Sequence, residues 1–204
     1  MAITHETMVG EIKEWLGTGS VNAFGPPFAG KDIQGDNLTR SLNAVMLGGG
    51  DILRGSDVPD HVRQIMNSGG LIPTPDYVEI VLPHLSRAEF AYKPLVLSSV
   101  GRKLGEEQGV MEATQAAGHP IKVVPFFEIS PEVAFERLKL SDRKRPDDTP
   151  EALMVRFDEY QNSTLGVIDT YDRLGLMVQI DASGTEAEVY EATIRAIHEF
   201  ACRS

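Results

Sequence analysis

The sequence predicts an α/β fold, in which a parallel sheet of about five strands carries helices on both faces. Short apolar runs with the length of buried strands alternate along the chain with longer stretches of helical periodicity. This alternation is typical of parallel strands joined by right-handed helical crossovers. Lysine, arginine and glycine residues follow several of the predicted strands. Because ligands bind at the carboxyl ends of the strands in such sheets, these residues are candidates for a site.

The composition sets limits on the class of protein. The chain has 204 residues, of which 42% are hydrophobic and 24% charged, values that are ordinary for a globular protein of one to two domains. Its net charge of −11 argues against nucleic acid or an anionic membrane surface as the main partner. A phosphorylated small molecule fits this charge, since local arginines can reverse the field inside a cleft.

Several features favour a cytoplasmic location. The single cysteine, Cys202, cannot form an intrachain disulfide, which fits a reducing compartment. No apolar run approaches the ~20 residues that cross a membrane, and the acidic residues near the N-terminus do not fit a secretory signal. We therefore expect a cytoplasmic protein without a membrane partner. The sequence does not indicate an oligomeric state directly, and a monomer is the expectation.

The chain opens with a predicted amphipathic helix over residues 4–16. Its apolar residues Met8, Ile12, Trp15 and Leu16 fall on one side of the helix. We expect residues 1–19 to dock on the core as a helical appendage, with Trp15 as a packing anchor.

A glycine-rich loop, Gly25-Pro-Pro-Phe-Ala-Gly-Lys-Asp32, connects a strand predicted over 20–24 to a helix predicted over 32–46. Glycines let backbone N–H groups turn inward around an anion, and the start of a helix adds partial positive charge. Lys31 adds a full positive charge. Strand, glycine loop, lysine and helix in this order predict a phosphate-binding loop.

A helical insertion is predicted over residues 51–87, between two strands of the sheet. Asp51 is expected to cap its first helix. A second helix is predicted over 59–68. A third begins at Thr74, where the threonine would cap the helix and the following proline would take the first helical position.

The rest of the chain returns to strand–helix alternation. Pro125 cannot donate a hydrogen bond to the sheet, so an irregularity is expected in its strand. Ser130 and Thr149 each precede Pro-Glu and are predicted helix caps, and Thr185 with Glu188 forms a capping box. The predicted strands cover 94–100, 121–129 and 176–181, and the predicted helices cover 105–117, 130–140, 149–174 with a bend near Gly166, and the stretch after Thr185.

These motifs, in this order, resemble the adenylate kinase family of nucleoside monophosphate kinases over nearly all of residues 20–203. The family's phosphate loop, Gly-x-Pro-Gly-x-Gly-Lys-Gly-Thr-Gln, is similar to the segment from Gly25 to Gln34. Its Ser-Thr-Gly-Asp-Leu-Leu-Arg motif appears as Gly48-Gly-Gly-Asp-Ile-Leu-Arg54, and its Gly-x-Leu-Val-Pro-Asp turn as Gly70-Leu-Ile-Pro73. Its lid exit, Arg-x-Asp-Asp, appears as Arg145-Pro-Asp-Asp148, followed by Arg156.

The resemblance implies a P-loop kinase core over residues 20–50, 88–140 and 149–204. The insertion over 51–87 would bind the nucleoside monophosphate (NMP), and residues 141–148 would form a short lid. The implied activity is reversible phosphoryl transfer from ATP to a nucleoside monophosphate, with AMP as the expected acceptor and Mg²⁺ as the cofactor.

Each residue that matches a family motif carries an implied role. Lys31 would bridge the β- and γ-phosphates of the donor, while Arg54 and Arg102 would hold the acceptor phosphate. Phosphoryl transfer needs positive charge around the moving group, which Arg145 and Arg156 would supply. The implied ATP site comprises Gly25, Pro26, Pro27, Phe28, Ala29, Gly30, Lys31, Asp32, Ile33 and Arg137, the last beside the donor adenine. The implied NMP site comprises Gly49, Asp51, Arg54, Ile72, Arg102, Glu106, Arg145 and Arg156.

The sequence also departs from the family pattern around the expected metal. The family's Asp-Gly-Phe-Pro-Arg motif appears as Ser98-Ser-Val-Gly-Arg102, which loses the aspartate, and Ile33 replaces a hydroxyl residue. Asp32 adds a carboxylate directly after the lysine. We hypothesise that Asp32 replaces the lost carboxylate near Mg²⁺; the alternative is that it only stabilises the start of the helix. Phe28 replaces a glycine, which requires a negative φ or a shifted loop.

Acceptor selection is altered as well. Gly49 replaces a hydroxyl and Glu106 a glutamine that help to read adenine in the family. An ionised carboxylate accepts hydrogen bonds without donating, so Glu106 would suit an exocyclic amino group, as on adenine, cytosine or guanine, and would disfavour uracil. Two alternatives to an NMP kinase stay open: another small-molecule P-loop kinase, or a nucleotide-binding protein that has lost transfer activity.

Overall fold

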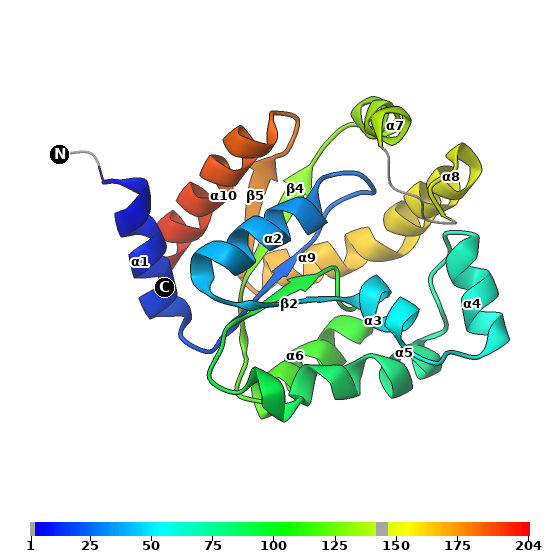
Figure 1. Cartoon of the computed structure of the whole chain (residues 1–204), viewed down its shortest axis with the longest axis horizontal. Coiled ribbons are helices and arrows are strands. Elements are labelled where there is room, and N and C mark those ends of the chain that lie inside the picture. The colour runs from blue at the N-terminus through cyan, green and yellow to red at the C-terminus, as the bar shows by residue number, and fades with distance from the viewer. Residues whose placement is uncertain (1–2, 142–146) are drawn as a thin grey trace.

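The computed structural model describes residues 3–141 and 147–204, and its centre is a five-stranded sheet in which all strands are parallel (Figure 1). The order of strands across the sheet is β2-β3-β1-β4-β5. The predicted α/β fold with a parallel sheet is therefore confirmed. The strands are β1 (Ser20–Ala23), β2 (Val45–Gly48), β3 (Leu95–Ser98), β4 (Ile121–Glu128) and β5 (Met177–Asp181).

Helices cover both faces of this sheet. Strand residues alternate between the two faces: Leu95 and Leu97 of β3 point into one hydrophobic cluster and Val96 into the other. The helices are α1 (His5–Leu16), α2 (Lys31–Leu42), α3 (Gly49–Gly55), α4 (Asp60–Asn67), α5 (Thr74–Ile80), α6 (Glu106–Ala116), α7 (Pro131–Leu140), α8 (Pro150–Glu159), α9 (Leu165–Arg173) and α10 (Glu186–Ala201), with short turns η1 (Leu82–Ser86), η2 (Ala88–Phe90) and η3 (Tyr160–Thr164).

One face is covered by α1, α2 and α10. Figure 1 shows the first and last helices side by side. Met8, Ile12 and Leu16 of α1 are buried against apolar residues of α2, α10 and the strands. The Trp15 ring meets Phe200 of α10 edge-on, at 6.0 Å between ring centroids. The predicted N-terminal helix thus packs on the core, and Trp15 takes part in that packing.

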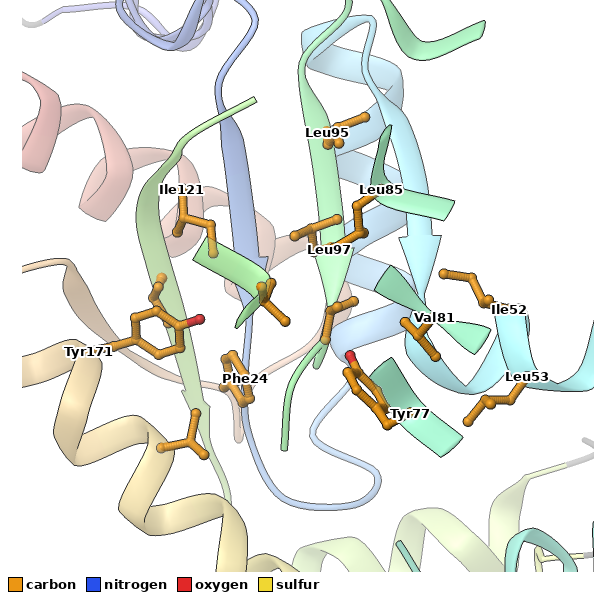
Figure 2. Packing of buried hydrophobic residues seen from close by; sticks show 14 of the residues in the cluster. Phe24, Ile52, Leu53, Tyr77, Val81, Leu85, Leu95, Leu97, Ile121 and Tyr171 are labelled. Carbon is orange, nitrogen blue, oxygen red and sulfur yellow. The ribbon is translucent and has the colours of Figure 1, made fainter. Parts of the chain in front are cut away.

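The other face carries α6, α9 and the helices between β2 and β3. Phe24 and Tyr171 lie at its centre, with ring centroids 5.7 Å apart (Figure 2). Buried residues of α3, α5 and η1, among them Leu53, Tyr77 and Leu85, continue the same cluster. The helices over residues 49–86 are therefore anchored to the sheet by an apolar base.

The first helix after the glycine loop is shorter than predicted. The sequence predicted a helix over 32–46, but α2 ends at Leu42 and β2 begins at Val45. Asn43 adopts a left-handed conformation, with φ 53°, which terminates the helix. Val45 and Met46 fall within the predicted helix because their spacing continues its apolar face, and both instead belong to a strand.

Most predicted helix caps are confirmed. The side chains of Ser130, Thr149 and Thr185 accept hydrogen bonds from backbone N–H groups in the first turns of α7, α8 and α10. Two predicted caps are wrong. Asp51 lies within the first turn of α3, whose cap residue is Gly48, and Thr74 is already helical, after Pro73 as the cap residue of α5.

Both predicted irregularities have counterparts in the structure. The pairing of β1 with β4 shifts register between Ser20 and Val21, where Val21 pairs with Val123, and beyond it only an isolated bridge joins Phe24 to Phe126, next to Pro125. The helical stretch predicted over 149–174 contains the π-helical turn Tyr160–Thr164, two residues before Gly166. Within the described residues, no helix has both the length and the apolar character to cross a membrane.

Candidate active site

A cleft of about 700 Å³ opens at the carboxyl ends of the strands. Its walls come from the loops that follow β1, β2, β3 and β5, from the α4–α5 connection, and from α8 with the π-helical turn behind it. Gly69 in the α4–α5 connection lies so close to α8 that a Cβ there would stand 2.7 Å from the Ala152 carbonyl oxygen. The cleft is thus bounded on opposite sides by elements that approach one another beyond the sheet.

The loop after β1 forms the floor of the cleft. Gly25 has φ 153°, and a Cβ at this position would lie 2.4 Å from the Phe127 carbonyl oxygen, so a side chain cannot be accommodated. The Lys31 ammonium at the start of α2 donates hydrogen bonds to the carbonyl oxygens of Gly25 (2.8 Å) and Pro26 (2.7 Å). These contacts hold the charge over the loop, at the positive end of a helix.

Phe28 lies in the left-handed region, with φ 61°. Of the two expected ways to place a side chain here, a negative φ or a shifted loop, the negative φ is therefore wrong, and the loop carries a strained residue. The contacts of Phe28 account for its retention: the Arg156 guanidinium lies 5.6 Å from its ring centroid, and its carbonyl oxygen accepts a 3.1 Å hydrogen bond from Arg137. Phe28 thereby connects the loop to two cationic side chains.

Arg137 of α7 is held by backbone carbonyl groups. Besides Phe28, its guanidinium donates to the Ala182 carbonyl oxygen at 2.7 Å, in the loop after β5. This arginine therefore joins the glycine loop to the loop after β5.

Two polar residues meet between the glycine loop and the end of β3. The Ser98 hydroxyl donates a 2.8 Å hydrogen bond to Oδ1 of Asp32. Both residues line the cleft, and the half-exposed Ile33 side chain lies beside them. Two of the positions at which the sequence departs from the family pattern, Asp32 and Ser98, are thus in direct contact.

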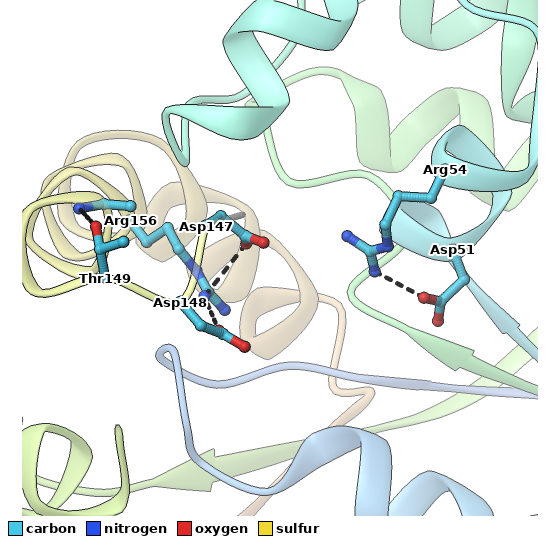
Figure 3. A network of polar contacts seen from close by, with 7 residues as sticks. Asp51, Arg54, Asp147, Asp148, Thr149 and Arg156 are labelled. Carbon is cyan, nitrogen blue, oxygen red and sulfur yellow. Dashed lines mark hydrogen bonds and ion pairs between the residues drawn. The ribbon is translucent and has the colours of Figure 1, made fainter. Parts of the chain in front are cut away.

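The guanidinium groups of Arg54 and Arg156 extend toward one another from α3 and α8 (Figure 3). Arg54 pairs with Asp51 at 2.6 Å. Arg156 pairs with Asp147 at 3.4 Å and with Asp148 at 3.5 Å, and its side chain is 17% exposed. Both arginines that line the cleft are thus paired with acidic neighbours.

Arg102 completes the positive lining, in the loop between β3 and α6. Burial lowers the pKa of its guanidinium, and the neighbouring Tyr77 and Glu106 oppose this shift. An arginine remains charged in a protein in any case. Lys31, Arg54, Arg102 and Arg156, which come from four separate elements, all line one cleft. In an acidic protein, this convergence favours a ligand with several negative charges.

Glu106 at the start of α6 is buried, at 5% exposure. Its carboxylate accepts hydrogen bonds from the backbone N–H groups of Arg102 and Lys103, each at 3.1 Å, and from the Thr74 hydroxyl at 3.0 Å. The Thr74 side chain therefore donates its hydrogen bond to Glu106 and does not cap the helix that Thr74 begins.

Most predicted site residues converge in this cleft. Pro26 does not line it, although its carbonyl oxygen holds Lys31. Arg145 and part of the predicted lid lie outside the described residues. The predicted residues that line the cleft are Gly25, Pro27, Phe28, Ala29, Gly30, Lys31, Asp32, Ile33, Gly49, Asp51, Arg54, Ile72, Arg102, Glu106, Arg137 and Arg156.

Sequence reasoning missed several lining residues, among them Tyr77, Ser99, Tyr160 and Glu186. Ser99 directly follows the end of β3, so its position after a strand was a usable signal. The sequence around Tyr77 carried no comparable signal, because its place depends on how α5 docks on the sheet.

One group of metal-type ligands lies elsewhere in the described residues. Glu11, His198 and Cys202 place one ligand atom each within 4.8 Å of one another, where α1 meets α10. Nε2 of His198 lies 2.5 Å from a Glu11 carboxylate oxygen, which is the spacing of a hydrogen-bonded ion pair. The group is thus explained by helix–helix packing.

Comparison with known proteins agrees with this geometry. Residues 23–176 match the family model described as adenylate kinase. An adenylate kinase of Prochlorococcus marinus (strain MIT 9211) is 31% identical over 178 residues, which cover 85% of this chain and 93% of that protein. An adenylate kinase of Xylella fastidiosa (strain 9a5c) is 27% identical over 181 residues, which cover 85% and 96%.

Proposed function

Because the chain belongs to the adenylate kinase family, whose members are ATP-using nucleoside monophosphate kinases, we propose that it catalyses the reversible reaction of ATP with AMP to give two ADP. The observation that supports this most is the convergence of Lys31, Arg54, Arg102 and Arg156 on one cleft. Transfer of a phosphoryl group depends mainly on positioning and on positive charge around its oxygens.

The position of each cation suggests its role. Lys31 extends over the glycine loop and would hold the β- and γ-phosphates of ATP. Arg54 and Arg102, which follow β2 and β3, would hold the phosphate of the acceptor. Arg156 contacts the Phe28 ring of the glycine loop and faces Arg54 (Figure 3), and it would stabilise the charge of the phosphoryl group during transfer. Arg145 would assist Arg156 from the lid.

The donor set at the cleft fits a magnesium ion. Asp32 and Ser98 bring a carboxylate and a hydroxyl together, and Mg²⁺ prefers oxygen ligands, often one or two carboxylates and substrate phosphates. We propose that Asp32 holds the ion or its water, oriented by Ser98. The ion would supply charge neutralisation on the phosphates.

Closure of the helical segment over 51–87 and of the short lid would exclude water from the transferred group. In the same proposal, Arg137 flanks the donor adenine while it ties Phe28 to the loop after β5.

A coupled assay of diphosphate formation tests the function. Purified protein, Mg-ATP and a panel of AMP, CMP, GMP, UMP and dAMP would be compared with Lys31→Ala. We expect turnover with AMP that falls by about 10³-fold in this variant, since Lys31 is placed at the transferring phosphates. Lys13→Ala, an exposed lysine of α1, is the matched control and should keep full activity.

The alternatives predict different results. A kinase for another small molecule would show ATP turnover only with an acceptor outside this panel. A nucleotide-binding protein would bind ATP and AMP without producing ADP, and either result would overturn the proposal.

A further inference from the structure

We propose that Tyr77 selects the acceptor base, and that together with Glu106 it favours a base with an exocyclic amino group beside an unprotonated ring nitrogen, as in adenine and cytosine. This inference rests on the proposed function, because it assigns the acceptor class of the same cleft. It adds a residue of α5 that no sequence motif indicates.

Tyr77 is a buried residue whose hydroxyl group can donate a hydrogen bond to a ligand. Its side chain lies in the same apolar cluster as Leu53 and Val81 (Figure 2), it is 7% exposed, and it also lines the cleft. Its hydroxyl oxygen accepts a 2.6 Å hydrogen bond from the Gly101 N–H. Within residues 3–141 and 147–204, no acceptor takes the hydroxyl proton. A buried donor without a partner is unfavourable, so an acceptor supplied by a ligand would be bound strongly.

The wall next to this hydroxyl is bare backbone. A Cβ at Gly49 would lie 3.9 Å from the Tyr77 hydroxyl oxygen and 3.5 Å from the Ser99 carbonyl oxygen. Ser99 itself adopts a left-handed conformation, with φ 47°. Among the described residues, no donor pairs with its carbonyl oxygen. A donor and an acceptor thus stand close together beside a surface on which a flat ring can lie.

Glu106 supplies a second acceptor in a fixed orientation. Its carboxylate already receives three hydrogen bonds, from Thr74, Arg102 and Lys103. A carboxylate has about four positions for accepting hydrogen bonds, so one is left for a ligand. Because the other three hold the group in place, it offers this position without rearrangement.

These groups match one pattern of base edges. An amino group has two N–H donors, which suit the two acceptors Glu106 and Ser99, and the neighbouring ring nitrogen accepts from Tyr77. Uracil presents carbonyl oxygens beside a single ring N–H, so one acceptor of the protein would face a carbonyl oxygen. Guanine has the same defect on its Watson–Crick edge, because O6 is a carbonyl oxygen and N1 carries a proton; the unprotonated nitrogen beside its amino group, N3, lies on the side of the sugar. Burial and the charge of Glu106 raise the pKa of Tyr77, so its hydroxyl stays protonated and remains a donor.

The test measures base preference in two independent ways. Turnover gives kcat/KM for AMP, CMP, GMP and UMP, and calorimetric titration gives the affinity for each monophosphate without turnover. In Tyr77→Phe, which keeps the ring, we expect kcat/KM and affinity for AMP and CMP to fall by about 10- to 100-fold. The values for UMP and GMP should change by less than about threefold, so that the AMP/UMP ratio collapses while the KM for ATP is kept.

Two further variants distinguish recognition of the acceptor base from a purely structural role of Tyr77 in holding the loop at Gly101. In Glu106→Gln, the amide can donate to a carbonyl oxygen, so the UMP/AMP ratio should rise by about tenfold or more. Tyr160→Phe removes another tyrosine hydroxyl from the same cleft and should leave the AMP/UMP ratio unchanged. Tyr77→Phe also removes the acceptor of the Gly101 N–H, and a uniform loss for all four acceptors would indicate loop support alone and overturn the inference.

The inference and the proposed function can fail separately. Turnover with a Tyr77-independent base preference, or with UMP as the best acceptor, would overturn the inference and leave an NMP kinase. Binding of AMP that depends on the Tyr77 hydroxyl, without any turnover, would support the inference as base recognition and overturn the proposed catalytic function.

Discussion

The hydroxyl of Ser98 donates a 2.8 Å hydrogen bond to the carboxylate of Asp32, although the two residues lie 66 positions apart in the sequence. Ser98 ends β3, and Asp32 lies in the first turn of α2. A carboxylate is missing at the first position and present at the second, relative to the family pattern. Their contact supports the proposal that one explanation covers both changes: the carboxylate at the end of β3 is replaced by one at the start of α2, which would lie near the bound phosphates.

This explanation predicts the effect of removing or moving the charge. Asp32→Asn should lower kcat by about 10- to 100-fold and should raise the Mg²⁺ concentration required for half-maximal activity. The double variant Asp32→Ser with Ser98→Asp returns the carboxylate to β3 and should recover much of this loss. The measurement is a magnesium titration of the initial rate. Unchanged activity and unchanged magnesium dependence in Asp32→Asn would leave Asp32 with a role in helix stability only.

Phe28 combines backbone strain with a useful contact, and two substitutions separate these effects. Phe28→Gly and Phe28→Ala both remove the ring that lies under Arg156, so both should lower kcat. Only glycine relieves the left-handed φ of 61°. Chemical denaturation should therefore show the glycine variant to be more stable than the alanine variant by about 1 kcal/mol. Equal stabilities would mean that the loop relaxes when the ring is absent.

Arg156 should be a strict requirement for transfer. Arg156→Ala should reduce kcat by about 10³-fold or more, as expected for an arginine that stabilises the moving phosphoryl group. Arg156→Lys should restore only a small part, because a lysine cannot reproduce the planar fork of five donors. Steady-state kinetics at saturating ATP and AMP measure both. Arg195→Ala, an exposed arginine of α10, serves as the control for loss of a positive charge.

Asn22 connects the sheet to the loop that carries Arg102. Its fully buried side chain donates to the Val100 carbonyl oxygen at 2.9 Å and accepts from the Val100 N–H at 3.2 Å. Asn22→Leu leaves both backbone groups without a partner and should lower the free energy of unfolding by about 2–4 kcal/mol. The KM for the acceptor should also rise. Asn67→Leu, at an exposed site on α4, should have little effect on denaturation.

Ile12 provides a test of the N-terminal helix. The side chain is fully buried between α1 and the core. Ile12→Ala should destabilise the protein by about 2–5 kcal/mol and should leave the KM for both nucleotides unchanged, since α1 does not line the cleft. Glu14→Ala on the exposed side of the same helix is the control. A small effect of Ile12→Ala would show that α1 contributes little to folding.

The parts of the fold that depend on local chemistry were predictable. The caps at Ser130, Thr149 and Thr185 each need only a hydroxyl and the first turn of a helix. The end of α2 was missed, because Val45 and Met46 continue the helical spacing and the left-handed Asn43 was the only nearby signal to stop. Local patterns thus located elements well and their boundaries less well.

The same distinction holds for the site. The glycine loop and the arginines lie in short motifs, so their convergence on one cleft could be anticipated from the sequence. The contact between Ser98 and Asp32, and the place of Tyr77 beside Gly49, depend on how distant elements pack. Contacts between residues far apart in the sequence leave no regular spacing from which they could be predicted. In this chain, they involve several of the residues that depart from the family pattern.

The central position of β1 in the sheet has a consequence for synthesis of the chain. Its neighbours are β3 and β4: Ala23 pairs with Ser98 of β3, and the hydrogen bond from the Ser99 hydroxyl to the Ala23 carbonyl oxygen spans 76 residues of the chain. At roughly 5–20 residues per second, a nascent β1 waits on the order of 4–15 s for that partner. Ser20 and Asn22 make half of β1 polar, which lowers the tendency of an unpaired strand to aggregate. Asn22, which holds the loop of Arg102 in the folded protein, would therefore also reduce aggregation of the chain during its synthesis.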